Sequence, residues 1–149
     1  MPKRVVADAN VLVKWFVPEE YSDSAELLMN DHLHGIVTVT APLYALLEFT
    51  NTLRKYVIRG LLSKDMVIRA LKLLEEVDIE YVSMTFDTLR EAFSYALEKG
   101  VTVYDACYIL LARNYGVNMY TADEKLLGKL ANEEENVKHI KEYHTHDFH

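Results

Sequence analysis

Four acidic residues stand alone in stretches of sequence that otherwise have the apolar character of a protein core. They are Asp8, Glu48, Asp105 and Asp123. The stretches around the first three, residues 5–13, 35–53 and 100–112, contain no other Asp, Glu, Lys or Arg, and Asp123 is the first such residue after Arg113. An isolated carboxylate in apolar surroundings costs several kcal/mol unless it is paired or bound to a metal. Four such acids in one small protein therefore predict that a cation draws them together.

The expected positions of these acids favour a shared metal site. Carboxylate oxygens are hard ligands that suit Mg²⁺ or Mn²⁺. Asp8 and Asp123 fall at or just past the ends of predicted strands, whereas Glu48 and Asp105 fall in the early turns of predicted helices. In an open α/β sheet, ligands bind beyond the carboxyl ends of the strands. We therefore expect the four acids to line one crevice.

The elements that must position these acids alternate along the whole chain. Strands are predicted at residues 5–8, 36–40, 79–83 and 117–121, with an edge strand at 137–141. Helices are predicted at residues 21–34, 42–60, 63–77, 88–100, 105–115 and 123–130, after a short helix that Pro18 ends. Strands separated by helices form a parallel sheet with helices on both faces. We predict one α/β domain over residues 1–141 and a polar C-terminal tail over residues 142–149.

Helix starts are predicted from capping residues. Pro42 is suited to the first position of its helix, which then has an apolar stripe formed by Leu43, Leu46, Leu47, Thr50, Leu53 and Val57. Ser63 is expected to cap the next helix. Capping-box spacing marks two further starts, Asp23 with Glu26 and Thr88 with Glu91.

Each acid also has a structural explanation of its own. Asp105 could cap the N-terminus of its helix, a role that aspartate often fills. Asp123 could be a turn residue or a helix cap, and Asp8 could form an Asx turn with Asn10. Glu48 could pair with a basic residue from a distant segment. The hypothesis of a metal site is excluded only if all four structural explanations hold together.

Composition excludes several classes of protein. The 149 residues match a single domain, and the single cysteine, Cys107, excludes a disulfide framework and a Cys-rich zinc module. The net charge of −7 argues against binding nucleic acid mainly through bulk positive charge. We expect Cys107 to be a buried, inert thiol. Because no membrane or targeting segment is recognised, we expect a soluble cytoplasmic protein.

Four segments resemble the PIN-domain ribonucleases, and more narrowly the VapC-like toxins of toxin–antitoxin pairs. They are VVADANVLVKWF, APLYALLEFTNTLRK, VTVYDACYILLAR and YTADEKLL, which contain the four acids in the order of that family. The similarity extends from Val5 to about Val137. It implies a single PIN-like α/β domain with a five-stranded parallel sheet and helices on both faces.

The resemblance also implies an activity and a set of roles. It implies hydrolysis of RNA phosphodiester bonds, with Asp8, Glu48, Asp105 and Asp123 as catalytic residues that coordinate one or two Mg²⁺ or Mn²⁺ ions. Asn10 and Thr121 would be supporting polar groups, and Glu124 could share the role of Asp123. The implied partners are an RNA substrate, a second copy of the chain in a homodimer, and a small antitoxin protein.

Basic residues follow Glu48 along its predicted helix. Arg54, Lys55 and Arg59 are candidates for contacts with RNA phosphates, and a solvated helix face explains them equally well. A distant partner for Glu48, if it has one, would be Lys14 or Arg54.

Other functions predict different residues. A non-catalytic PIN module that binds RNA or a protein partner would not need all four acids. A haloacid-dehalogenase-like phosphatase needs a second Asp at the position of Asn10, and a phospho-acceptor receiver domain needs a lysine at that of Thr121.

The tail residues His144, His146, Asp147 and His149 could bind zinc or nickel adventitiously, but a polar terminus explains them better.

Overall fold

A five-stranded, wholly parallel sheet forms the centre of the molecule in the computed structural model, which describes residues 2–145. The strands are β1 (Lys3–Ala7), β2 (Val37–Pro42), β3 (Glu80–Val82), β4 (Met119–Thr121) and β5 (Val137–His139). Their order across the sheet is β3-β2-β1-β4-β5, and each neighbouring pair is parallel. The predicted parallel sheet is confirmed.

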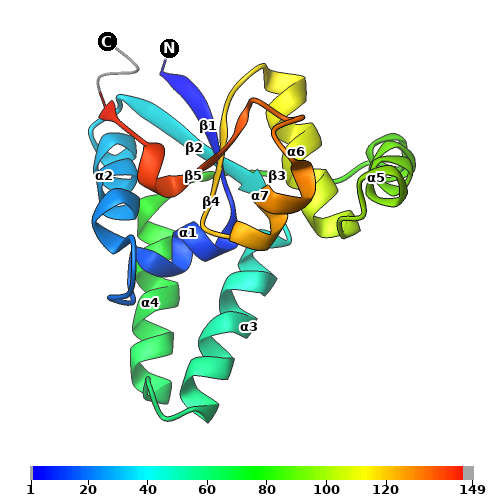
Figure 1. Ribbon diagram of the computed structural model, residues 1–149. Coiled ribbons are helices and arrows are strands. Elements are labelled where there is room, and N and C mark those ends of the chain that lie inside the picture. The colour runs from blue at the N-terminus through cyan, green and yellow to red at the C-terminus, as the bar shows by residue number, and fades with distance from the viewer. Residues whose placement is uncertain (1, 146–149) are drawn as a thin grey trace.

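Seven α-helices and one 3₁₀ turn connect and extend the strands within the described residues. They are α1 (Ala9–Lys14), α2 (Ser22–Leu33), α3 (Ala45–Ile58), α4 (Lys64–Val77), α5 (Phe86–Lys99), α6 (Val103–Tyr115), α7 (Glu124–Leu130) and η1 (Ile140–Glu142). Helices α2 and α6 lie on opposite sides of the sheet, while α3 and α4 project away from it as an antiparallel pair (Figure 1). None of these helices is long and apolar enough to cross a membrane.

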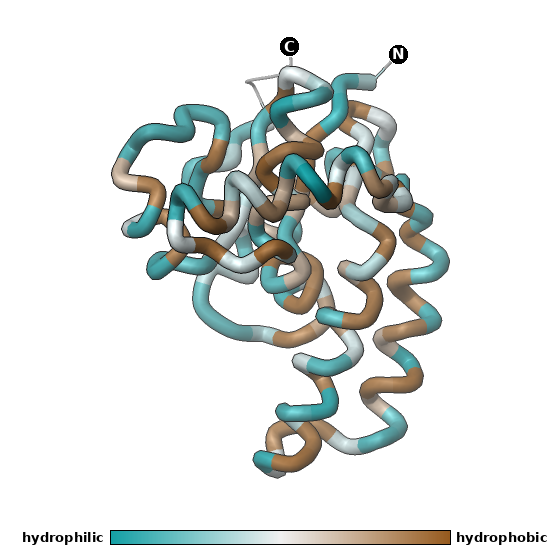
Figure 2. The backbone as a smooth tube through the Cα atoms, turned by 90° about the vertical axis from the view of Figure 1, so that its right-hand side faces the viewer, coloured by the Kyte–Doolittle hydropathy of each residue, from teal (hydrophilic) through white to brown (hydrophobic). Residues whose placement is uncertain are grey.

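The core lies between the central strands and the helices on the two faces. In β1, Val5, Val6 and Ala7 are fully buried, as expected of a central strand covered on both faces. Helix α6 is buried continuously from Ala106 to Ala112, which explains why its sequence is almost free of charge. Hydrophobic and hydrophilic residues instead alternate along the projecting helices, which are largely exposed (Figure 2). Cys107 is buried and free, as expected.

The start of α3 differs from the prediction. Pro42 is the last residue of β2, not the first residue of a helix, because the parallel pairing with β3 continues through Pro42 and the next residue, Leu43, donates its backbone N–H to Val82 O at 2.8 Å. The helix begins three residues after Pro42. Its buried face is therefore formed by Ala45, Phe49 and Leu53 at i, i+4 and i+8.

The caps were partly predicted. Ser63 caps α4, and its hydroxyl accepts from Met66 N at 3.2 Å. The box assigned to Thr88 was wrong: Thr85 is the cap, and Thr88 is the residue whose N–H it accepts. At α2 the cap is Tyr21, in a left-handed conformation and without a side-chain cap bond. Capping-box spacing alone did not distinguish the N-cap residue from a residue in the first turn of the helix.

The C-terminus packs on the domain as far as the structure describes it. Tyr143 is buried and its hydroxyl donates to Asp31 Oδ2 at 2.5 Å. Three of the tail residues considered for metal binding, His146, Asp147 and His149, lie outside the described residues.

Candidate active site

The first acid, Asp8, lies directly after β1 at the carboxyl edge of the sheet. It is the N-cap residue of α1, yet its side chain makes no cap bond. Instead, Asp8 Oδ2 accepts from Thr121 Oγ1 at 2.9 Å and from Asn10 Nδ2 at 3.2 Å. Asp8 as a residue is only 7% exposed. The Asx turn considered above would use the backbone N–H of Asn10, whereas the bond observed comes from the Asn10 side chain. Two neighbouring parallel strands, β1 and β4, thus place Asp8 and Thr121 together.

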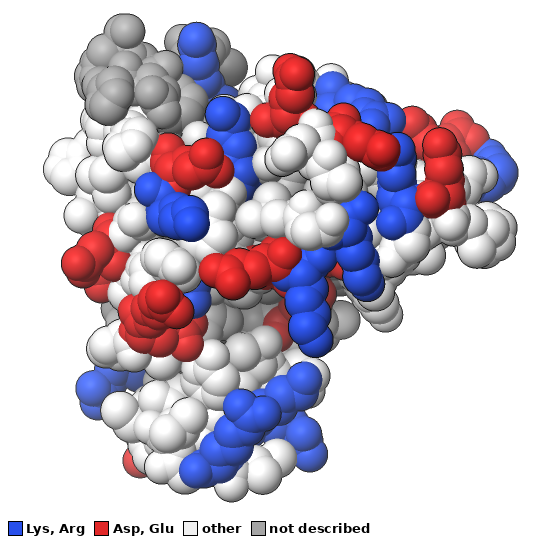
Figure 3. Space-filling view, viewed as in Figure 1, with Lys and Arg blue, Asp and Glu red and all other residues white. Residues whose placement is uncertain are grey.

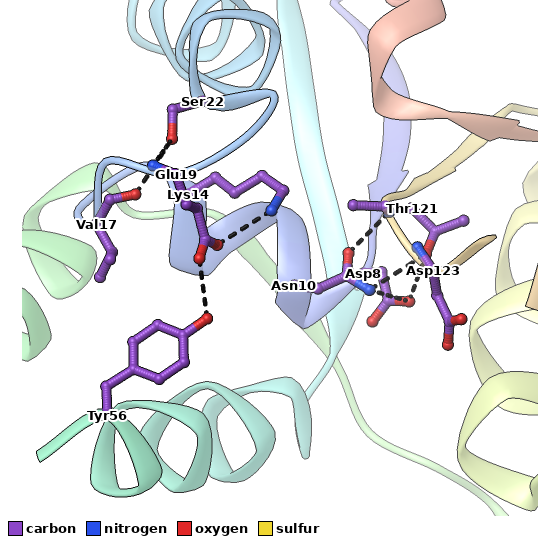
Figure 4. A network of polar contacts seen from close by, with 10 residues as sticks. Asp8, Asn10, Lys14, Val17, Glu19, Ser22, Tyr56, Thr121 and Asp123 are labelled. Atoms are coloured by element: carbon purple, nitrogen blue, oxygen red, sulfur yellow. Dashed lines mark hydrogen bonds and ion pairs between the residues drawn. The ribbon is translucent and has the colours of Figure 1, made fainter. Parts of the chain in front are cut away.

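Asn10 and Thr121 join the two strand ends into one network, which Figure 4 shows from close by. Asn10 Oδ1 accepts from Ala122 N at 3.0 Å, and its Nδ2 also reaches Thr121 Oγ1 at 3.3 Å. The Thr121 hydroxyl, fully buried, accepts in addition from Asp123 N at 3.0 Å. These hydrogen bonds fix the position of the Asp8 carboxylate relative to the backbone of Ala122 and Asp123.

Asp123 has the capping role that was considered for it. Asp123 Oδ1 accepts from Leu126 N at 3.1 Å at the N-terminus of α7. The cap uses one carboxylate oxygen, so the second is available to another partner. Glu124, proposed as a substitute, is exposed and has its carboxylate 3.8 Å from His139 Nε2, on the side of β5.

The other two acids come from helices. Glu48 lies in the first turn of α3, and Tyr108 donates its hydroxyl to Glu48 Oε1 at 2.9 Å. Asp105 lies in the first turn of α6, but the cap there is Thr102, whose hydroxyl accepts from Asp105 N at 3.0 Å. The explanation of Asp105 as an N-cap is therefore wrong. Lys14 pairs with Glu19 at 3.0 Å, so it is not the partner of Glu48.

The charges of the other three acids act on the ionisation of Asp8. Burial raises the pKa of Asp8 most strongly, the bond from Thr121 lowers it, and the negative charges of Glu48, Asp105 and Asp123 add to the rise, which brings the pKa to about 7. Burial also raises the pKa of Glu48 and that of Asp105. Ionising all four groups together is costly without a cation.

The donor chemistry fits a hard divalent cation. Within residues 2–145, the side-chain hydrogen bonds to Asp8 all reach Oδ2, so Oδ1 is available as a ligand. As placed, however, no three carboxylate, imidazole or thiol side chains of the described residues are grouped closely enough to hold an ion. The four acids supply the right ligand type, and binding one ion requires their side chains to approach one another.

The basic residues proposed to contact RNA lie apart from this network. Arg54, Lys55 and Arg59 are exposed on α3 and its C-terminal end. Figure 3 shows Lys and Arg side chains over the lower part of the molecule, where α3 lies.

Sequence analysis missed two features of the site. One is Tyr108, whose position three residues after Asp105 on the same helix face gives a signal that was available. The other is the ion pair of Lys14 with Glu19, which also accepts the hydroxyl of Tyr56 at 2.9 Å. Tyr56 lies 37 residues after Glu19, and no local pattern in the sequence predicts that its hydroxyl reaches the loop after α1.

Comparisons with known proteins agree with this architecture. The PIN domain family model matches residues 5–132. The chain is 36% identical over 132 residues to Ribonuclease VapC3 of Pyrobaculum aerophilum, covering 85% of this chain and 94% of that protein. The crystal structure of PAE2754 from Pyrobaculum aerophilum has a TM-score of 0.65 at 24% identity, over 85% of this chain and 79% of that one. Mycobacterium tuberculosis VapC20, a Sarcin-Ricin loop cleaving toxin, has a TM-score of 0.65 at 15% identity, over 83% and 93% respectively. The chain belongs to the PIN-domain family and is a VapC-like member of it.

Proposed function

We propose that this protein is a metal-dependent endoribonuclease and the toxin of a toxin–antitoxin pair. The observation that carries the proposal is the buried carboxylate of Asp8, whose pKa is raised to about 7 by burial first and then by the charges of Glu48, Asp105 and Asp123. The similarity to Ribonuclease VapC3 over most of both chains supports RNA as the substrate.

In this proposal Asp8, Glu48, Asp105 and Asp123 hold Mg²⁺ or Mn²⁺. When bound, such an ion lowers the pKa of a coordinated water and stabilises charge on phosphate oxygens. Thr121 and Asn10 orient the Asp8 carboxylate, because both donate to its Oδ2, and Oδ1 would be the oxygen that binds the ion. Tyr108 restrains Glu48 through one hydrogen bond. Arg54, Lys55 and Arg59 contact RNA phosphates.

The proposed function includes protein partners in the cytoplasm, an antitoxin and a second copy of the chain. An exposed apolar row on α5 supports a protein partner, since Phe86 is 79% exposed, Phe93 58% and Leu97 71%. Exposed large apolar side chains gathered on one element commonly mark an interaction site. Light scattering tests the homodimer: a monomer at assay concentration would remove it while leaving the nuclease.

The test is cleavage of a mixed pool of labelled structured RNAs in Mg²⁺ or Mn²⁺. The controls are EDTA and an Asp105→Asn protein purified in the same way. We expect cleavage by the wild type that both controls abolish. Cleavage that persists in the Asp105→Asn preparation would identify a contaminant and contradict the assignment.

A non-catalytic module that binds RNA or a partner protein is the second candidate. One observation favours it: the described side chains as placed contain no group of three metal ligands. RNA binding by a protein that neither cleaves RNA nor binds Mn²⁺ would establish this candidate instead.

A further inference from the structure

A buried lysine lies beside the acidic site and has no role in the proposal above. Lys14 is 9% exposed and is the last residue of α1, one helical turn after Asn10 and on the same face of that helix. Its ammonium pairs with Glu19 Oε1 at 3.0 Å, and Glu19 Oε2 accepts from the Tyr56 hydroxyl at 2.9 Å. Figure 4 shows this group next to the network of Asp8, Asn10 and Thr121.

A purely structural role does not account well for this ion pair. Removing two charges from water costs free energy that their attraction often fails to recover, so apolar residues of similar size frequently stabilise a protein as well or better. The surrounding residues of α1, Val11, Leu12 and Val13, are fully buried apolar side chains that already anchor the helix. A cation held at this depth therefore suggests a ligand.

The space in front of Lys14 is a surface depression of about 340 Å³. Lys14 and Lys125 contribute positive charge to its lining, whereas Glu20, Glu124 and the proposed metal ligand Asp123 contribute negative charge. The volume lies at the lower end of the range for small-ligand pockets.

We propose that Lys14 binds an RNA backbone phosphate next to the scissile bond, and that Glu19 holds the Lys14 ammonium in position. Lysine acts on phosphate as a point charge with rotatable donors, which suits backbone contact without base selection. The position next to a cleaved bond rests on the proposed function. The contact between Lys14 and an RNA phosphate does not require cleavage. Lys14 is thus a substrate-binding residue for a chain whose net charge otherwise repels RNA.

The test compares two substitutions that break the same ion pair. Lys14→Met removes the cation, while Glu19→Gln leaves it and removes only its partner. Lys14→Arg keeps the charge, and Lys72→Met removes an exposed lysine on α4 as a control for net charge. Each protein is assayed for cleavage kinetics in Mg²⁺ and for Kd with labelled RNA in EDTA, over a series of salt concentrations, with thermal melting as the measure of folding.

We expect Lys14→Met to raise KM and Kd about tenfold, with a smaller change in kcat, and to reduce the slope of log Kd against log salt by about 0.7, the value for one lost contact with a single strand. Lys14→Arg keeps most of the affinity, Glu19→Gln weakens binding less than Lys14→Met and leaves the salt slope unchanged, and Lys72→Met matches the wild type. Equal losses in Lys14→Met and Glu19→Gln with an unchanged salt slope would overturn the inference and leave a structural ion pair.

The same measurements separate this inference from the proposed function. Lys14-dependent RNA binding without any cleavage by the wild type would remove the nuclease and retain the phosphate contact. Metal-dependent cleavage with a Kd and salt slope unaffected by Lys14→Met would retain the nuclease and remove the contact. Absence of RNA binding by the wild type would overturn both.

Discussion

The strand side and the helix side of the candidate site hold their acids differently. On the strand side, Asp8, which follows β1, is tied to the loop that carries Asp123 by side chains of Asn10 in α1 and Thr121 in β4. On the helix side, Glu48 receives one side-chain bond, from Tyr108. Asp105 is anchored at its backbone, where its N–H donates to the cap of α6.

This difference indicates which half is already shaped for an ion. Parallel strands fix Asp8 and Thr121 through the register of the sheet, and the buried hydroxyl of Thr121 adds three polar contacts. The two helical acids instead project from first turns and are only partly buried. We infer that the strand side is preorganised and that the helix side adjusts when the four carboxylates approach a cation. The predictions below test this inference, beginning with the largest effect.

The acids themselves give the largest expected effect. Asp8→Asn and Asp105→Asn each remove a proposed ligand and a negative charge, so we expect RNA cleavage to fall by more than about a thousandfold, equivalent to roughly 4 kcal/mol. Because like charges repel in the metal-free state, the melting temperature in EDTA should stay equal or rise. A large loss of melting temperature in both variants, with cleavage largely retained, would indicate structural roles.

Thr121→Val tests the strand side. The substitution keeps the shape of the side chain but removes the hydroxyl that orients Asp8, and polar groups that orient metal ligands typically contribute 10–100-fold. We expect a loss of cleavage of about 10–100-fold at saturating metal, measured as kcat/KM. The variant also removes the acceptor of Asp123 N and one of the hydrogen bonds of Asn10, so unfolding should cost about 1–3 kcal/mol less. Unchanged cleavage would contradict preorganisation.

The raised pKa of Asp8 makes stability depend on pH. Between its ordinary value and about 7, the folded protein retains a proton that the unfolded chain releases. The stabilising contribution is therefore complete at low pH and is lost as pH rises through about 7. In EDTA we expect the free energy of unfolding to fall by about 2 kcal/mol between about pH 5.5 and 8 on account of this group.

Urea denaturation of the wild type and of Asp8→Asn measures this effect as a difference between the two proteins. The Asn variant should lack the fall that is due to Asp8. Parallel pH profiles for the two proteins would show that Asp8 does not titrate in this range.

Tyr108→Phe tests the helix side and has the smallest expected effect. It removes the only side-chain hydrogen bond to Glu48 within the described residues. If the helix side adjusts on binding, an ion holds Glu48 without this bond, and we expect cleavage to fall less than about tenfold. A loss as large as that of Thr121→Val would show that both sides are equally preorganised.

The sequence was sufficient to predict the parallel sheet and the elements beside which the four acids lie, for a physical reason. Lone carboxylates in apolar stretches and alternating strand and helix patterns are local signals. Together they predicted Asp8 and Asp123 at or just past strand ends and Glu48 and Asp105 in the early turns of helices, as the structure has them. The end of β2 at Pro42 was not predictable in this way, because pairing with β3, about 40 residues away, decides it. The bonds that Asn10 and Tyr56 make across the fold depend likewise on tertiary contacts.

The central claim is that the four acids bind a common divalent ion, and a melting experiment tests it most directly. Wild type and Asp105→Asn are melted in EDTA and in a series of Mn²⁺ concentrations. At a hundred times its dissociation constant, Mn²⁺ should stabilise the wild type by about 2.7 kcal/mol, and the Asn variant should show little or no shift. No shift in the wild type at millimolar Mn²⁺, or an equal shift in both proteins, would contradict a metal site formed by these carboxylates.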